Sequence, residues 1–260
     1  MSWIITGTQK LDPDAQAYIG RVEQADQANL EPAVKDAINA FVVGCKADGI
    51  WNAIKASCIL AGARTLEGAL VPLTGTAPTN YNFVAGDYNR KTGLVGDGST
   101  KYLDSNRANN ADPQNSHHLA AYCSVIPTIG GFPNVMSSTP YGTTGATQLY
   151  IRKSSNQWEA QSRNSIGQTT TNLSSTSPTF VGVSRNTSSN VTIRANGISG
   201  NNSINSQVPG SQPTRVFAFS ANGVNFNGRL AFYSIGEALD LALFDARVTT
   251  LINAFSTAIP

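Results

Sequence analysis

The carboxylates of this chain are distributed unevenly, and their distribution limits the chemistry that the protein can perform. No aspartate or glutamate lies between Glu159 and Glu237, a stretch rich in serine, threonine, asparagine and glycine. General acid–base hydrolysis and oxygen-ligated metal sites both need carboxylates that converge on one place. The sequence therefore predicts a non-enzymatic protein with a β-rich structural or binding surface. The charged residues within this stretch are Arg163, Arg185, Arg194, Arg215 and Arg229.

Two residue patterns were considered as metal sites. His117 and His118 are adjacent, and neighbours on a strand point to opposite faces, so they cannot chelate one ion without a bulge. Asp97, Asp104 and Asp112 are candidate calcium ligands, but calcium needs several converging oxygens. The one dense run of Asp and Asn lies at 106–115. We therefore predict no metal ligand and no cofactor.

Catalytic motifs for sugar or phosphate chemistry are missing from the sequence. A glycosidase needs two carboxylates facing one cleft, and no Glu-x-Asp-x-x-Glu-like run occurs. The glycine-rich segment 93–98 lacks the Lys-Ser/Thr of a phosphate loop and leads into a strand, so we interpret it as a turn. Tyr141, Tyr150 and Trp158 would stack on sugar rings if exposed, but core positions are the favoured interpretation. Catalytic residues are thus predicted to be absent, and ligand-binding residues stay unassigned.

Composition narrows the class of partner. The net charge of +2 gives no reason to expect nucleic-acid binding, and charged residues make up 13% of the 260 positions. The first residues show no basic, apolar signal peptide, and no window has the length of a membrane span. We therefore expect synthesis in the cytoplasm without membrane insertion. Cys45, Cys58 and Cys123, an odd number, are expected to be buried thiols.

The elements that must position these residues fall into two regions of different periodicity. From about residue 12 to 70 the period is helical. Asp12 is suited to cap a first helix that Pro13 begins, and Pro32 begins a second helix. The second helix ends at 48–49, and its apolar stripe consists of Val34, Ile38, Phe41, Val42 and Cys45.

A third helix is expected to follow residue 49, and a short helical turn at Leu66 and Leu70 would end before Pro72. We define residues 1–75 as a helical N-terminal region with two open interpretations. It either caps the sheet or docks the rest of the protein to a larger assembly. The apolar face of the third helix would be formed by Ile50, Ile54, Cys58 and Ala61.

From about residue 80 to the C-terminus the period becomes two, with turn residues at the spacing of a sandwich or barrel. Residues 119–125 are expected to form a buried strand, and 149–152 and 157–160 a hairpin. Residues 191–194 lead into Asn196-Gly197, a strong two-residue hairpin signal, and 215–219 are followed by Asn222-Gly223 in the same way.

The C-terminal part should contain a last strand and a helix. The strand is expected at 226–234, and Asp240 should cap the helix that follows it. The apolar stripe of this helix is Phe244, Val248, Leu251, Ile252 and Phe255. The fold class predicted is mainly β, an antiparallel jelly-roll sandwich over 80–260, with an α-helical N-terminal region and a C-terminal helix.

Three segments in order resemble the concanavalin-like (laminin-G-like) jelly roll. They are 96–103 (GDGSTKYL), 193–197 (IRANG) and 226–233 (FNGRLAFY) followed by a helix, and the resemblance covers about 80–258. With the alanine-rich lead-in at 39–51, the whole pattern also resembles proteins encoded by tailed phages. The resemblance implies a virion structural protein: a capsid decoration (cement) protein or a tail-borne adhesin that contacts a major capsid or tail protein.

Three functions are compatible with these features to different degrees. The first is the non-enzymatic virion surface protein, with the helical region as anchor and the jelly roll exposed to host-surface glycans. The second is a free lectin-like carbohydrate-binding module. The third is a polysaccharide depolymerase, which the missing carboxylate pair disfavours.

The chain is also expected to form a homo-oligomer, a trimer. A sandwich must protect its edge strands, and the β region holds just Lys91, Lys101 and Lys153 to do so. The apolar stripe of the second helix is larger than a helix that only caps the sheet requires. We therefore expect protomers to meet through the helical region or through one sheet edge.

Overall fold

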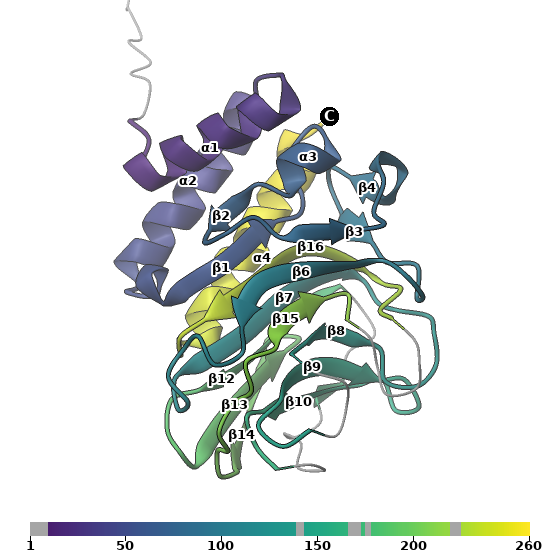
Figure 1. The fold of residues 1–260 in the computed structure, drawn as a ribbon. Helices are drawn as coiled ribbons and strands as arrows, with labels where there is room; N and C mark the ends of the chain where they lie inside the picture. The colour runs from purple at the N-terminus through teal and green to yellow at the C-terminus, as the bar shows by residue number, and fades with distance from the viewer. Residues whose placement is uncertain (1–9, 139–142, 166–172, 175–177, 219–224) are drawn as a thin grey trace, which may run out of the picture.

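The computed structural model describes residues 10–138, 143–165, 173–174, 178–218 and 225–260. The described strands form two antiparallel sheets that pack face to face as a sandwich (Figure 1). This confirms the mainly β, jelly-roll-like class with flanking helices. Among the described residues, no helix combines the length and apolar character needed to span a membrane.

Sheet A has nine strands and sheet B has seven. The order in sheet A is β14 (Ile198–Ser203), β13 (Asn190–Ala195), β12 (Thr179–Arg185), β7 (His117–Val125), β16 (Arg229–Gly236), β1 (Ile54–Ile59) and β2 (Pro72–Thr74), with β5 (Gly93–Val95) on β16 and β4 (Tyr88–Asn89) on β5. The order in sheet B is β11 (Leu173–Ser174), β10 (Gln157–Ser162), β9 (Thr147–Arg152), β8 (Asn134–Ser137), β15 (Pro213–Val216), β6 (Tyr102–Ala108) and β3 (Thr79–Tyr81).

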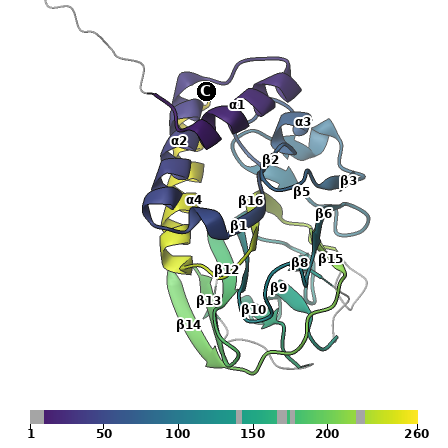
Figure 2. The same ribbon diagram turned by 60° about the vertical axis from the view of Figure 1, so that its left-hand side comes forward.

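Helices cover the face of sheet A that points away from sheet B (Figures 1 and 2). These are α1 (Pro13–Asp26), α2 (Pro32–Ala47) and α4 (Leu241–Ala258). Phe41 of α2 and Phe244 of α4 meet Phe232 of sheet A, with ring centroids 5.8 Å and 5.7 Å from it. The molecule therefore has two apolar cores, one between the sheets and one between sheet A and the helices.

The helix ends follow the sequence signals closely. The Asp12 carboxylate accepts a hydrogen bond from the Asp14 amide, and Pro13 is the first residue of α1. Asp240 Oδ1 accepts hydrogen bonds from the Ala242 and Leu243 amides at 2.7 and 3.1 Å, which caps α4. The predicted first, second and C-terminal helices are thus confirmed, as is a short α3 (Leu66–Ala69).

The apolar stripe of α2 is buried within its own chain, with each stripe side chain at most 3% exposed. It packs against α4 and sheet A. The expectation that this stripe offers a surface to a second protomer is therefore wrong, because the chain's own C-terminal helix already covers it. Whether the protein is a homo-oligomer stays a prediction.

The prediction of a third helix after residue 49 is also wrong. A short 3₁₀ turn (Trp51–Ala53) leads into strand β1, which pairs with β16 and β2. Ala56 and Cys58 of β1 contribute to the core between the sheets, whereas Ile54 and Ile59 contribute to the helix-covered core. A strand that is buried on both faces shows no polar alternation, so a short apolar run cannot be told from a helix by periodicity.

The predicted hairpins are confirmed where the structure describes them. β9 and β10 pair through Glu159↔Tyr150 and their neighbours. β13 and β14 are joined by Asn196 and Gly197, both with positive φ (53° and 73°), as a two-residue primed turn requires. The segment 219–224, with the expected Asn222-Gly223 turn, lies outside the described residues. The last strand begins at Arg229, three residues later than expected.

The cysteines are buried, as expected, although Cys58 lies in β1 and not in a helix. Burial raises the pKa of Cys45 and of Cys58 to about 12, so both thiols stay protonated at neutral pH.

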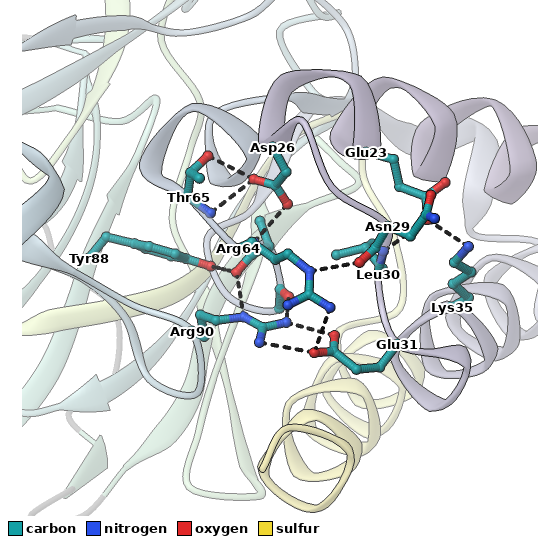
Figure 3. A network of polar contacts seen from close by, with 12 residues as sticks. Glu23, Asp26, Asn29, Leu30, Glu31, Lys35, Arg64, Thr65, Tyr88 and Arg90 are labelled. Carbon is teal, nitrogen blue, oxygen red and sulfur yellow. Dashed lines mark hydrogen bonds and ion pairs between the residues drawn. The ribbon is translucent and has the colours of Figure 1, made fainter.

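A polar network ties the α1–α2 connection to the residues before α3 and to β4 (Figure 3). The Asp26 carboxylate accepts hydrogen bonds from the Arg64 and Thr65 amides at 2.7 and 2.9 Å. Arg90 forms a two-point ion pair with Glu31, at 3.1 and 2.7 Å. These contacts connect the helices to the sheet region. The division of the chain near residue 75 stays a prediction, and β1 and β2, which precede it, belong to sheet A.

Candidate functional site

The outer face of sheet B carries a row of polar side chains. Residues paired directly across neighbouring strands share a face of the sheet. The register places six polar residues in one line across β10, β9, β8, β15, β6 and β3: Gln161, Gln148, Ser137, Arg215, Asp104 and Thr79. Their sequence neighbours, such as Leu149, Val216 and Leu103, point into the core between the sheets. Sheet B is thus apolar on one face and polar on the other.

This polar row is buried at its β10 end, called here the closed end, and exposed to solvent toward β3, called here the open end. Gln161, Gln148 and Ser137 are buried, whereas Arg215 and Thr79 are exposed. At the closed end, Gln161 Nε2 donates hydrogen bonds to the main-chain oxygens of Thr143 and Asn164, at 2.9 and 3.0 Å. The accessible part of the face therefore lies over β15, β6 and β3.

A cavity of about 450 Å³ lies at this open end. Such a volume is within the range of small-molecule sites. Most of the residues that line it carry a hydroxyl or amide group, and one lining residue is charged. The lining consists of Ser99, Thr100, Tyr102, Ser137, Ser138, Gln212, Pro213, Arg215, Ala218 and Asn225.

The rim of the cavity is held by a carboxylate. Asp97 accepts hydrogen bonds from the Ser99, Thr100 and Lys101 amides at 2.9, 2.9 and 3.0 Å. Burial raises the pKa of Asp97, but the hydrogen bonds from Lys101, Ser99 and Thr100 lower it more strongly, to about 2. Asp97 was considered as a calcium ligand, and in the structure it orders the loop at 96–101.

An aromatic stack adjoins the cavity through Tyr102, which belongs to its lining. Tyr81 of β3 pairs directly with Tyr102 of β6, and the two rings stack with centroids 4.3 Å apart and an interplanar angle of 10°. The Arg215 guanidinium lies over the Tyr102 ring, with Cζ 4.7 Å from the centroid. Tyr81 is 40% exposed. A flat aromatic surface beside hydroxyl and amide groups suits a polar ligand with an apolar ring face.

The closed end of the same face holds a buried charge. Glu159 is fully buried, accepts a hydrogen bond from the Tyr150 hydroxyl at 2.8 Å, and pairs with Arg152 through Nη2 at 2.9 Å. Trp158 lies in the core between the sheets. Tyr150 and Trp158 are therefore buried, as the favoured interpretation held, and Tyr141 lies outside the described residues.

The remaining candidate metal ligands lie in separate environments of the structure. His118 contacts the Glu237 carbonyl and Ser234 Oγ, whereas His117 contacts Ser162 Oγ, so the two rings have separate environments. Burial lowers the pKa of His118 to about 4. Asp112 pairs with Arg107. In the part of the chain that the structure describes, no three metal-binding side chains come together.

Sequence reasoning did not select Tyr81, Tyr102, Arg215 or Asn225 as site residues. Tyr102 lies in the segment 96–103, which carried the jelly-roll resemblance, and Arg215 in the carboxylate-free stretch. Both segments are noticeable in the sequence. The contact between Tyr102 and Arg215 nevertheless depends on the pairing of β15 with β6, whose residues lie more than a hundred positions apart.

No protein-family model and no curated protein matches the sequence. Solved structures do resemble the fold. The binding domain of botulinum neurotoxin DC in complex with SialylT superposes with a TM-score of 0.51 at 14% identity, covering 78% of this chain and 52% of that one. The binding domain of botulinum neurotoxin serotype D gives 0.51 at 13%, covering 76% and 52%.

A sialidase gives a similar result. A mutant Trypanosoma rangeli sialidase that displays trans-sialidase activity has a TM-score of 0.53 at 12% identity, covering 93% of this chain and 38% of that one. The chain thus spans about half of the neurotoxin domains and less of the sialidase. At these identities the likeness shows a β-sandwich fold in common.

Proposed function

We propose that this protein is a non-enzymatic, lectin-like carbohydrate-binding protein whose site is the cavity at the open end of sheet B. The observation that carries the proposal is the stack of Tyr81, Tyr102 and Arg215, because Tyr102 and Arg215 of this stack line a cavity together with several hydroxyl and amide side chains. Sugars combine hydroxyls with an apolar ring face, and both kinds of partner are present here. The neurotoxin domain solved with SialylT shares the β-sandwich.

A glycan array tests this proposal. We expect the full chain to bind a defined set of glycans with or without calcium, and Tyr81→Ala to weaken that binding about tenfold through loss of the aromatic surface. Leu243→Ala is the matched control, because Leu243 is also an exposed apolar residue, 41% exposed, but lies on α4, on the far side of sheet A. A protein that binds no glycan would contradict the proposal.

A depolymerase is disfavoured by the arrangement of carboxylates. On the outer face of the described part of sheet B, Asp104 lies on β6 and Glu159 on β10, four strand positions apart. That spacing corresponds to about 19 Å. Glycosidases hold their two carboxylates at about 5 to 9.5 Å. Release of reducing ends from a host polysaccharide would contradict this part of the proposal.

The finer proposal is display on a tailed-phage particle, as a tail-borne adhesin or a capsid decoration protein. The resemblance of the whole pattern, including the alanine-rich lead-in at 39–51, to tailed-phage proteins supports it, together with the low content of charged residues. A glycan-binding face would serve an adhesin directly. Mass spectrometry of purified particles tests the proposal, and cryo-electron microscopy would separate head from tail. Absence of the protein from particles would contradict it.

We also propose a homo-oligomer, a trimer, that forms through a sheet edge. β14 is an edge strand of sheet A, is largely exposed, and contains neither lysine nor proline. Pairing of this edge with a second copy would satisfy its main-chain groups. Light scattering on the full chain is the test, and a stable monomer would contradict the proposal.

A further inference from the structure

The arginines of this chain differ in how their charges are satisfied, and Arg215 is the exception. The sequence holds eleven arginines, all at described positions. Six pair with a carboxylate, namely Arg64, Arg90, Arg107, Arg152, Arg194 and Arg247. Four donate to main-chain carbonyls, namely Arg21, Arg163, Arg185 and Arg229.

Arg215 forms no hydrogen bond or ion pair with any residue that the structure describes. Its contact is the Tyr102 ring, 4.7 Å from Cζ. Asp104 is its direct neighbour across the β15–β6 pairing but does not form an ion pair with it, and the Asp104 carboxylate instead accepts the Asn106 amide at 2.9 Å. Stacking on Tyr102 restrains the guanidinium while its N–H groups stay available to a ligand.

A second unpaired polar group lines the same cavity. Asn225 is 3% exposed, and its Oδ1 has no hydrogen-bond partner. A buried acceptor without a partner costs free energy, which a ligand hydroxyl would recover. The cavity therefore presents an unused cationic donor, Arg215, and an unused neutral acceptor, Asn225. A complementary ligand offers an anionic acceptor together with an O–H donor.

We infer that the sugar bound in this cavity carries a carboxylate, and that Arg215 is the residue that binds it; this inference rests on the proposed function. The planar guanidinium matches a carboxylate through two parallel hydrogen bonds. Asn225 Oδ1 accepts a ring hydroxyl, and Tyr81, which stacks on Tyr102 and is 40% exposed, offers an aromatic surface next to the cavity for the sugar ring. Among the described residues that line the cavity, none carries a carboxylate that would repel such a ligand.

The experiment compares matched acidic and neutral glycans on one array. We expect acidic members to bind at least about tenfold more strongly than their neutral counterparts, because a charge-assisted, two-point hydrogen-bonded pair is stronger than a neutral hydrogen bond. Arg215→Gln should remove this preference, and Arg215→Lys should restore part of it, because lysine keeps the charge but not the planar geometry. Arg21→Gln is the control, since it removes one exposed arginine from α1.

The outcomes separate the two proposals. Binding of neutral glycans alone, or an unchanged preference in Arg215→Gln, overturns the carboxylate inference and leaves glycan binding intact. Binding of sulfated but not carboxylated glycans also overturns it, because the shared anionic chemistry would then come from another group. If no glycan binds, the proposed function fails. In that case galacturonate and galactose are titrated separately into the protein, and the Arg215 Nε–H NMR signal is followed. If galacturonate does not shift this signal, the carboxylate inference is overturned as well.

Discussion

The outer faces of the two sheets carry opposite kinds of side chain. The outer face of sheet A presents residues such as Tyr122, Phe180 and Phe232 to α2 and α4, and β7 and β12 are buried almost throughout. The outer face of sheet B presents amides, hydroxyls and charges, and it is exposed near Arg215. An apolar face must be covered by another element, whereas a polar face can meet solvent or a ligand. The difference separates the face that holds the helices from the face that carries the proposed binding site.

The largest loss of stability is expected when a charge is placed on the helix-covered side of sheet A. Phe41 is 3% exposed and meets Phe232 and Phe244 edge-on or tilted. We expect Phe41→Ala to lower the free energy of unfolding by about 4 kcal/mol and Phe41→Asp to prevent folding. Urea denaturation followed by circular dichroism measures this. Ser188→Asp, in an exposed turn, should stay within about 0.5 kcal/mol of the wild type.

A smaller loss is expected at the closed end of the polar face. Glu159→Gln leaves Arg152 without its carboxylate and changes the partner of the Tyr150 hydroxyl. Because Arg152 is about one-third exposed, water compensates part of the loss, and we expect about 2 kcal/mol. The same denaturation curves give this value. A Glu159→Gln variant as stable as the wild type would show that this end of the face is not held by the ion pair.

The stability of the loop at the rim of the cavity should decrease in acid. The pKa of Asp97 is lowered to about 2 from an ordinary value of 3.8, so Asp97 favours the folded loop above pH 3.8. This contribution is lost progressively as the pH falls from about 3.8 toward about 2. Asp97→Asn should lack this part of the acid dependence and should bind glycans more weakly. The acid titration of the Asp97 carboxyl carbon by NMR measures the pKa directly, and an ordinary value would contradict the assignment.

The smallest effect on stability is expected at the open end of sheet B. Arg215→Gln and Tyr81→Ala remove exposed side chains, so we expect changes within about 0.5 to 1 kcal/mol in the free energy of unfolding. Glycan binding should nevertheless fall about tenfold. Parallel denaturation and binding measurements on each variant test this separation. A variant that loses stability and binding in proportion would assign the open end a structural role.

Local signals predicted much of this fold because they act between residues close in sequence. Asp12, Asp240 and the prolines at 13 and 32 begin helices through their own backbone contacts. Asn196-Gly197 forms its turn because both residues adopt positive φ there. The segment at 54–59 was mispredicted because its state depends on pairing with β16, about 180 residues later in the chain.

The sequence by itself determined the fold class, the three long helices and the absence of a clustered carboxylate pair from the stretch between Glu159 and Glu237. Tertiary structure alone decided that the α2 stripe meets α4, that Tyr81 stacks on Tyr102, and that Arg215 has no ionic partner among the described residues. The physical reason is the register of the sheets. Pairing between distant strands determines which side chains share a face, and no local periodicity encodes that pairing.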